Sequence, residues 1–164
     1  MSVGLLRSLC TPGWVMRRHF TPAVLTDIEN AIAQVELRHA GEICFAVEHA
    51  LELSDLRHGV TPRERALEVF GLMRVWDTEA NNGVLVYVLF AERAVEIVAD
   101  RGISRVVPQE DWARVCTEVE QDFHAGRFRE GSLKAVREIA KLLEKHFPHL
   151  HGDGNELPDQ PLLL

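Results

Sequence analysis

Two short apolar runs joined by Ala91-Glu92-Arg93 constrain the fold of this chain more than any other feature. Gly83 to Phe90 is continuously apolar and too short for a helix, so it predicts a buried strand. Ala94 to Ala99 alternates apolar residues with Glu96, as a less buried strand does. Because the link is so short, the second strand must turn back antiparallel to the first.

A third strand precedes this hairpin. Glu42 to Glu48, EICFAVE, has a continuously apolar middle and predicts another buried strand. Between it and Gly83 lies a helix in which Thr61 and Glu64 have the spacing of a capping box. A strand–helix–strand path requires a crossover, so strands 42–48 and 83–90 should be parallel, with a right-handed connection.

The segments before, between and after these strands have the periodicity of helices. The predicted helices begin or end at Pro22, Gly41, Pro62, Pro108, Gly126 and Pro148. The helix after Thr61 should bury Ala66, Phe70, Met73 and Trp76. Together the elements predict a three-layer α/β/α sandwich with a small mixed β-sheet, in which a fourth short strand lies near Ile103–Val107.

The length of 164 residues suits one domain. We divide the chain into an amino-terminal arm over residues 1–20, a domain over 21–147 and a flexible tail over 148–164. The formal net charge of −7 and the lack of an obvious basic face argue against a nucleic-acid partner. No run approaches the ~20 apolar residues of a transmembrane segment. No signal peptide precedes the domain either, so we expect a cytoplasmic protein.

The arm mixes leucine, tryptophan and phenylalanine with three arginines. Arms of this composition can lie on anionic membranes, or they can pack against their own domain or a partner protein. Because the run is short and broken by Pro12-Gly13, we favour packing against protein. A peripheral position at the inner membrane face is the alternative.

Turn-forming polar residues stand at both outer ends of the hairpin. The antiparallel pairing puts Val84 roughly opposite Asp100 and Asn82 roughly opposite Gly102. The preceding helix ends near Asp77, only a short loop away. The residues expected to meet at this rim of the sheet are Asp77, Asn81, Asn82 and Asp100.

Two interpretations of this rim remain open. Calcium accepts carboxylate, amide and carbonyl oxygens in flexible shells, so the set predicts a weak divalent-cation site, with Ca²⁺ as the candidate cofactor. Asparagine, aspartate and glycine also make turns in any fold, without a ligand. The opposite edge carries Glu48, His49 and Glu52, with Arg93 nearby, and we interpret it as a solvated strand end.

The residues around the hairpin resemble the TPM domain family. The resemblance rests on an ordered set of segments rather than on one motif, and it covers roughly residues 20–147. These segments are Gly41-Glu42-Ile43, Trp76 to Leu85, Glu92-Arg93, Val95 to Ile103, Val107-Pro108 and Phe123 to Phe128. The chain is similar to a short, signal-free bacterial subgroup of that family.

The resemblance implies an α/β/α sandwich and two kinds of activity. Some family members are described as acid phosphatases and others as calcium binders. This chain departs from the family where Asn81 replaces the usual Asp of Asp-Asn-Gly, and where Asp100-Arg101-Gly102 replaces Gly-x-Gly. One ligand carboxylate is thereby lost and another is gained in a different place.

Two functions follow from these observations. The first is a non-catalytic adaptor domain that acts with another protein and carries a weak cation site. The second is a metal-assisted acid phosphatase of low activity. The sequence contains no phosphate-binding glycine loop, no GxSxG nucleophile elbow and no HExxH metal motif, which favours the adaptor.

Overall fold

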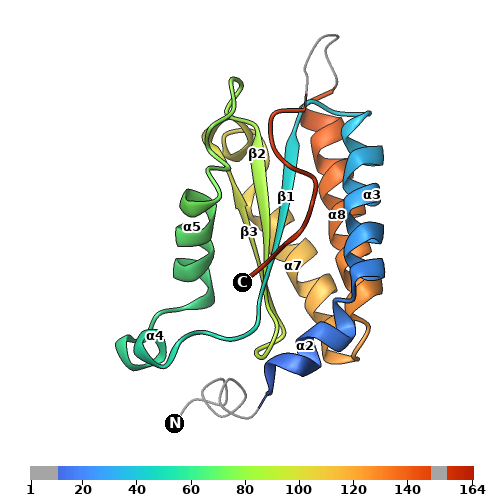
Figure 1. Cartoon of the computed structure of the whole chain (residues 1–164). Helices are drawn as coiled ribbons and strands as arrows, with labels where there is room; N and C mark the ends of the chain where they lie inside the picture. The colour runs from blue at the N-terminus through green and yellow to red at the C-terminus, as the bar shows by residue number, and fades with distance from the viewer. Residues whose placement is uncertain (1–10, 149–154) are drawn as a thin grey trace.

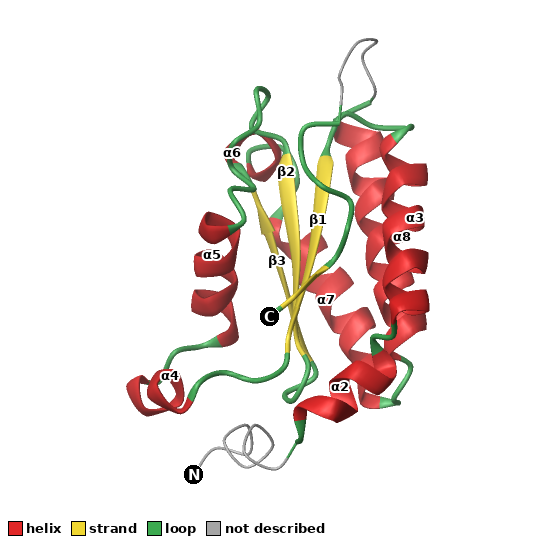
Figure 2. Ribbon diagram, viewed as in Figure 1, coloured by secondary structure: helices red, strands yellow, loops and turns green. Residues whose placement is uncertain are grey.

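A mixed sheet stands between two layers of helices in the computed structural model, which describes residues 11–148 and 155–164 (Figure 1). The strands are β1 (Glu42–Glu48), β2 (Gly83–Leu89), β3 (Ala94–Ala99) and β4 (Leu162–Leu163). The helices are α2 (Gly13–His19), α3 (Pro22–Glu36), α4 (Leu53–His58), α5 (Pro62–Leu72), α6 (Arg101–Ser104), α7 (Gln109–His124) and α8 (Phe128–His146). The predicted fold class is confirmed (Figure 2).

The sheet has the strand order β3-β2-β1-β4. β1 and β2 are parallel, with Glu42 opposite Gly83, and β2 and β3 are antiparallel, with Val84 opposite Ala99. Both predicted orientations are confirmed, and the predicted hairpin register is one residue from the observed one. The starts of β1 and β2 and the end of β3 therefore share one edge, which we call the rim, and the hairpin tip lies at the other.

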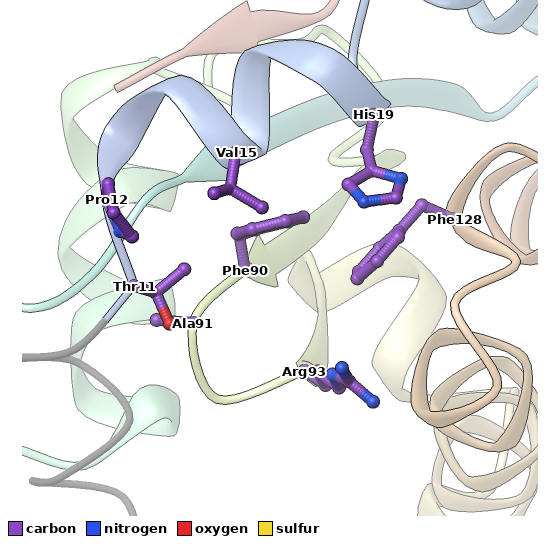
Figure 3. A pocket seen from close by; sticks show the side chains of 8 residues that line it. All are labelled: Thr11, Pro12, Val15, His19, Phe90, Ala91, Arg93 and Phe128. Atoms are coloured by element: carbon purple, nitrogen blue, oxygen red, sulfur yellow. The ribbon is translucent and has the colours of Figure 1, made fainter.

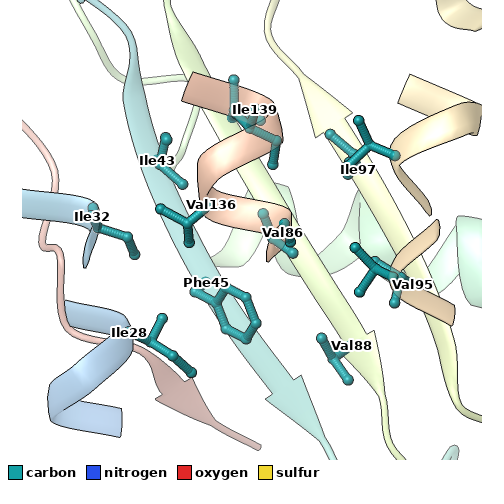
Figure 4. Close-up of a cluster of buried hydrophobic side chains, with 14 of the residues drawn as sticks. Ile28, Ile32, Ile43, Phe45, Val86, Val88, Val95, Ile97, Val136 and Ile139 are labelled. Atoms are coloured by element: carbon teal, nitrogen blue, oxygen red, sulfur yellow. The ribbon is translucent and has the colours of Figure 1, made fainter. Parts of the chain in front are cut away.

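Side chains of the central strands alternate between two cores, although β1 and β2 are apolar throughout. The larger core packs the sheet against α3, α7 and α8 (Figure 4). The smaller core, with Leu85 and Leu89, packs against Ala66 and Val69 of α5. This division makes the three layers and explains why both strands are buried on both faces.

Local signals set the starts of two helices as predicted. The Thr21 hydroxyl accepts a hydrogen bond from the Val24 amide at 3.3 Å, which caps α3. Thr61 and Glu64 form a complete capping box at the start of α5. Each cap satisfies backbone amides that have no partner inside the helix, so a few residues fix the helix start.

Two sequence predictions about smaller elements are wrong. Residues near Ile103–Val107 form no strand, because Asp100 caps the short helix α6 and Ile103 turns into the larger core. Trp76 is 49% exposed rather than buried. Helix α5 ends at Leu72, and Arg74 adopts a positive φ of 54°, which turns the chain away before Trp76.

The fourth strand comes instead from the tail. Leu162 and Leu163 pair in parallel with Ala46 and Val47 of β1, and Leu157 is buried in the smaller core. The described end of the tail is thus docked on the sheet, whereas the sequence predicted a flexible segment. Two residues of strand are too few to leave a periodic pattern.

The described part of the arm also packs on the domain. Met16 and Phe20 are buried in the larger core, so residues 13–20 contribute apolar surface to the domain, whereas the sequence predicted a separate arm there. In residues 11–148 and 155–164, no helix has the length and apolarity needed to cross a membrane.

Candidate functional site

The rim brings together three of the four predicted ligand residues. The Asp100 amide donates to the Gly83 carbonyl at 2.8 Å, and the Gly102 amide donates to the Asn81 carbonyl at 2.9 Å. These bonds tie the end of β3 to the start of β2. Asn81, Asn82 and Asp100 therefore lie at one edge of the sheet because of the hairpin pairing.

Asn82 is held at this edge by several hydrogen bonds and is only 2% exposed. Its backbone amide donates to the Thr78 hydroxyl at 3.1 Å, and its carbonyl accepts from the Glu42 amide at 3.0 Å. Its side-chain amide donates to the Ala40 carbonyl. With the amide nitrogen fixed in this way, Oδ1 is buried and accepts no hydrogen bond from the described residues.

Asp100 is 5% exposed and has one engaged and one unengaged oxygen. Oδ1 accepts from the Arg101 amide at 2.6 Å, which caps α6. Oδ2 is buried without a hydrogen-bond donor among the described residues. A buried acceptor without a donor costs about 1–3 kcal/mol, so a water or a cation is the usual explanation for such an atom.

Asn81 and Arg101 form the outer part of the rim. Asn81 has a positive φ of 52°, a conformation that asparagine tolerates better than most residues, and its Oδ1 accepts from Arg101 at 2.9 Å. A cavity of about 180 Å³ opens here, lined by Ala80, Asn81, Arg101, Gly102 and Arg105. Because two arginines line this cavity, its solvent side attracts anions and repels cations.

Gly102 is required by the close approach of two chain segments. A Cβ at this position would lie 2.5 Å from the Asn81 carbonyl oxygen and 2.8 Å from the Ala80 carbonyl oxygen. A side chain there would force the end of β3 away from the loop before β2. Glycine therefore permits the close backbone approach at the rim.

Asp77, the fourth predicted ligand, is engaged elsewhere. Its carboxylate pairs with the Arg74 guanidinium at 2.5 Å, and its side chain is 49% exposed. The positive φ of Arg74 places the two residues on a surface turn after α5. The inward-facing oxygens at the rim therefore come from Asn82 and Asp100.

An acidic cavity of about 270 Å³ lies beside the rim, and sequence reasoning missed it. Glu36, Glu42 and Asp159 are among its lining residues. Glu36 accepts from the Ile43 amide at 2.7 Å, and Glu42 accepts from the Leu157 amide at 3.2 Å. Burial, together with the nearby charges of Glu42 and Asp159, raises the pKa of Glu36 to about 8.

The acidic cavity is explained by tail docking rather than by metal binding. Asp159 belongs to the tail and meets Glu36 only because the tail returns along β1. Among the residues that the structure describes, no group of three or more histidine, cysteine, aspartate or glutamate side chains has a metal-binding arrangement. No local signal in the sequence could have paired Asp159 with Glu36 and Glu42, since more than a hundred residues separate it from them.

At the opposite edge, Glu48 is not the solvated residue that the sequence suggested. It is 6% exposed, and its carboxylate accepts from Arg65 Nε at 2.9 Å and from the Tyr87 hydroxyl at 2.6 Å. Burial, followed by the hydrogen bond to Glu48, raises the pKa of Tyr87. Both carboxylate oxygens are engaged, so this network holds α5 on the sheet.

A cavity of about 370 Å³ lies near the same edge, between α2 and the hairpin tip (Figure 3). Its lining includes His19, Phe90, Arg93 and Phe128. Burial, followed by the charges of Arg18 and Arg93, lowers the pKa of His19. The sequence placed Arg93 near this edge, but the aromatic wall comes from distant segments and had no local signal.

Comparisons with known proteins agree with this fold. A family model for the TPM domain matches residues 17–142. The BA42 protein of the psychrophilic bacterium Bizionia argentinensis, solved by NMR, is 28% identical, with a TM-score of 0.77 over 88% of this chain and 94% of that one. A comparison with curated proteins gives no match.

Two further NMR structures share the fold alone. The amino-terminal domain of a P. gingivalis protein is 18% identical, with a TM-score of 0.64 over 80% of this chain and 82% of that one. The amino-terminal domain of the cg2496 protein of Corynebacterium glutamicum is 11% identical, with a TM-score of 0.54 over 87% and 79%.

Proposed function

Because the chain belongs to the TPM domain family, we propose that it is a non-catalytic adaptor domain that holds one divalent cation weakly at the rim. One observation carries the proposal. Asn82 Oδ1 and Asp100 Oδ2 are both buried at the same sheet edge, and neither receives a hydrogen bond from the described residues. These oxygens are the protein ligands, and water completes the shell.

The expected affinity is low for reasons of charge. Asp100 is the one carboxylate in this ligand pair, and the neighbouring guanidinium groups of Arg101 and Arg105 oppose a cation at the outer side. We therefore expect a Kd for Ca²⁺ of about 10⁻⁴ to 10⁻³ M, in the range of extracellular modules rather than sensors. Water molecules would supply the remaining oxygens of the Ca²⁺ shell.

Calorimetric titration with CaCl₂ tests the cation site. Asp100→Asn should abolish the binding heat, because it removes the site's charge while keeping the cap on α6. Asp77→Asn is the matched control and should bind as the wild type does, since Asp77 pairs with Arg74 at the surface. Loss of binding in Asp77→Asn, or no binding in the wild type, would contradict this site.

Two buried carboxylates support the adaptor part of the proposal, because both are engaged by neighbouring side chains. Glu48 is fully engaged by Arg65 and Tyr87, and Asp122 is paired with Arg127 and Lys134. The side-chain hydrogen bonds from Lys134 and Arg127 lower the pKa of Asp122. Both groups hold helices in place, and neither is positioned as a catalytic base.

An exposed apolar strip is the surface we propose for a protein partner. Trp14 of α2 is 60% exposed, and the chain end carries exposed leucines beside the same helix. These leucines are Leu162, Leu163 and Leu164. Leu163 and Leu164 share a cavity with Met16 and Arg17 of α2, and exposed apolar groups on neighbouring elements are typical of interaction surfaces.

The alternative occupant of this strip is an anionic membrane, because Arg17 and Arg18 are exposed on the same helix. Sedimentation with vesicles of anionic phospholipid separates the two. A cytoplasmic adaptor that binds protein stays in the supernatant. Co-sedimentation that is lost in Trp14→Ser would show that the strip binds the inner membrane face instead of a protein.

Metal-assisted phosphoester hydrolysis is the second candidate function, and one observation favours it. The cavity lined by Arg101 and Arg105 adjoins Asp100, so a phosphate could sit beside a bound cation. An assay with p-nitrophenyl phosphate and added Ca²⁺ or Mg²⁺ across pH decides it. The adaptor proposal predicts no turnover; turnover near ~10 s⁻¹ that is abolished by Asp100→Ala would contradict it.

A further inference from the structure

We propose that the cavity between α2 and the hairpin tip binds a small aromatic carboxylate. The cavity lies beyond the carboxyl end of β2, and the rim lies at the amino end of the same strand, so the two sites are independent. Ligands of open α/β sheets bind outside the carboxyl ends of the parallel strands. A volume of about 370 Å³ is at the lower end of small-molecule sites and suits one ring with a short acid arm.

The apolar half of the cavity is an aromatic wall. The ring centroids of Phe90 and Phe128 are 4.7 Å apart, and the His19 imidazole lies 4.7 Å from Phe128. Figure 3 shows the three side chains gathered on one side, with Val15 of α2 beside them. Rings at these spacings offer a planar guest stacked or edge-to-face contact, which an aliphatic guest of equal size lacks.

The polar half of the cavity is formed by the Arg93 side chain. Its Nη1 donates to the His124 carbonyl at 2.7 Å, which anchors the guanidinium to the end of α7. A guanidinium has five N–H donors, so an anchored arginine still presents a planar fork to a carboxylate. Charge complementarity therefore selects an anion, and the geometry of the fork selects a planar one.

The backbone of Arg93 gives independent support. Arg93 has a φ of 56°, in the left-handed region that favours glycine or asparagine. A hairpin link that ends in a left-handed residue is usually built with glycine there. The chain instead places a long cationic side chain at this position, beside the largest cavity described above, and the proposed carboxylate contact accounts for that choice.

NMR titration of the full chain with sodium phenylacetate tests the inference. We expect saturable shifts of the amides of residues 15–19, 90–93 and 128. 2-Phenylethanol, which has the ring without the charge, and cyclohexylacetate, which has the charge without the ring, should each bind at least about tenfold more weakly. Phenyl phosphate shows whether a phosphate can replace the carboxylate, and it should bind no more tightly than phenylacetate.

Arg93→Gly is the decisive variant, because glycine suits the local backbone while removing the fork. It should stay folded and bind phenylacetate at least about tenfold more weakly, whereas the exposed control Arg137→Gln should bind as the wild type does. If Arg93→Gly loses its dispersed spectrum, Arg93→Asn tests the same contact. Equal binding of 2-phenylethanol and phenylacetate, unchanged affinity in the Arg93 variants, shifts elsewhere, or no saturable shift would overturn the proposal.

Discussion

The Tyr87 hydroxyl donates a 2.6 Å hydrogen bond to the Glu48 carboxylate across the parallel pair β1–β2. The same carboxylate is held by the Arg65 guanidinium of α5 through Nε and Nη2. One buried acidic group thus joins two strands to a helix. Networks of this kind are costly to break because each remaining partner is left buried and unsatisfied.

Glu48→Ala should lower the free energy of unfolding by about 3–5 kcal/mol, because it leaves Arg65 Nε, Arg65 Nη2 and the Tyr87 hydroxyl without their acceptor. Urea unfolding monitored by circular dichroism measures the change. Glu68→Ala is the matched control, since Glu68 pairs with the same arginine but its side chain is 58% exposed. It should cost about 1 kcal/mol or less, and equal losses in the two variants would refute the network's role.

The packing of the arm gives a second prediction. Phe20 is 2% exposed and contacts Phe90 and Phe128 edge-on, so Phe20→Ala should cost about 3–5 kcal/mol. Trp14→Ala, in the preceding helix but largely exposed, should change stability by about 0.5 kcal/mol or less. Thermal unfolding of both variants checks this. A small effect of Phe20→Ala would mean that residues 13–20 add little to the stability of the domain, as the sequence predicted for an independent arm.

The elements that could be predicted from the sequence are those whose signals lie within a few neighbouring residues. Thr21 and Thr61 cap their helices with residues three positions away, so their motifs are visible in the sequence. β1 and β2 are buried on both faces and therefore appear as unbroken apolar runs. β4 has no such signal, because the position of Leu162 and Leu163 is set by pairing with a strand more than a hundred residues earlier.

The candidate site shows the same limit. Hairpin topology places Asn82 and Asp100 at one edge, which the sequence could predict from the length of the link. Asp77 could have joined the rim or paired with a nearby side chain. The sequence could not show that the turn at Arg74 places Asp77 in an ion pair with that arginine. The cavity lined by His19, Phe90, Arg93 and Phe128 is formed where α2, the hairpin tip and α8 meet, so no single motif in the sequence indicates it.

The acidic cavity beside the rim predicts an unusual pH dependence. The pKa of Glu36 is raised from 4.5 to about 8, so the folded state binds more protons than the unfolded state between these values. Stability from this group is complete below about pH 4.5 and is lost as the pH rises through about 8. Glu36→Gln keeps an acceptor for the Ile43 amide and removes the titration.

Melting temperatures at pH 5 and pH 8.5 test whether stability falls as the pH rises. The wild type should melt at a lower temperature at pH 8.5 than at pH 5, and Glu36→Gln should show a smaller difference. Some dependence should remain, because burial also raises the pKa of Glu42. An equal difference in the two proteins, or higher wild-type stability at pH 8.5, would show that Glu36 does not titrate as described.

The cation site at Asn82 and Asp100 is tested most directly by paramagnetic NMR. Substoichiometric Mn²⁺ should broaden the amide signals of residues 81–83 and 100–102 first, and excess Ca²⁺ should restore them. Asp100→Asn should show no selective broadening at these positions. Broadening that begins at Glu36, Glu42 and Asp159, or that has no preferred location, would contradict the account and leave Asn82 and Asp100 as turn-forming residues.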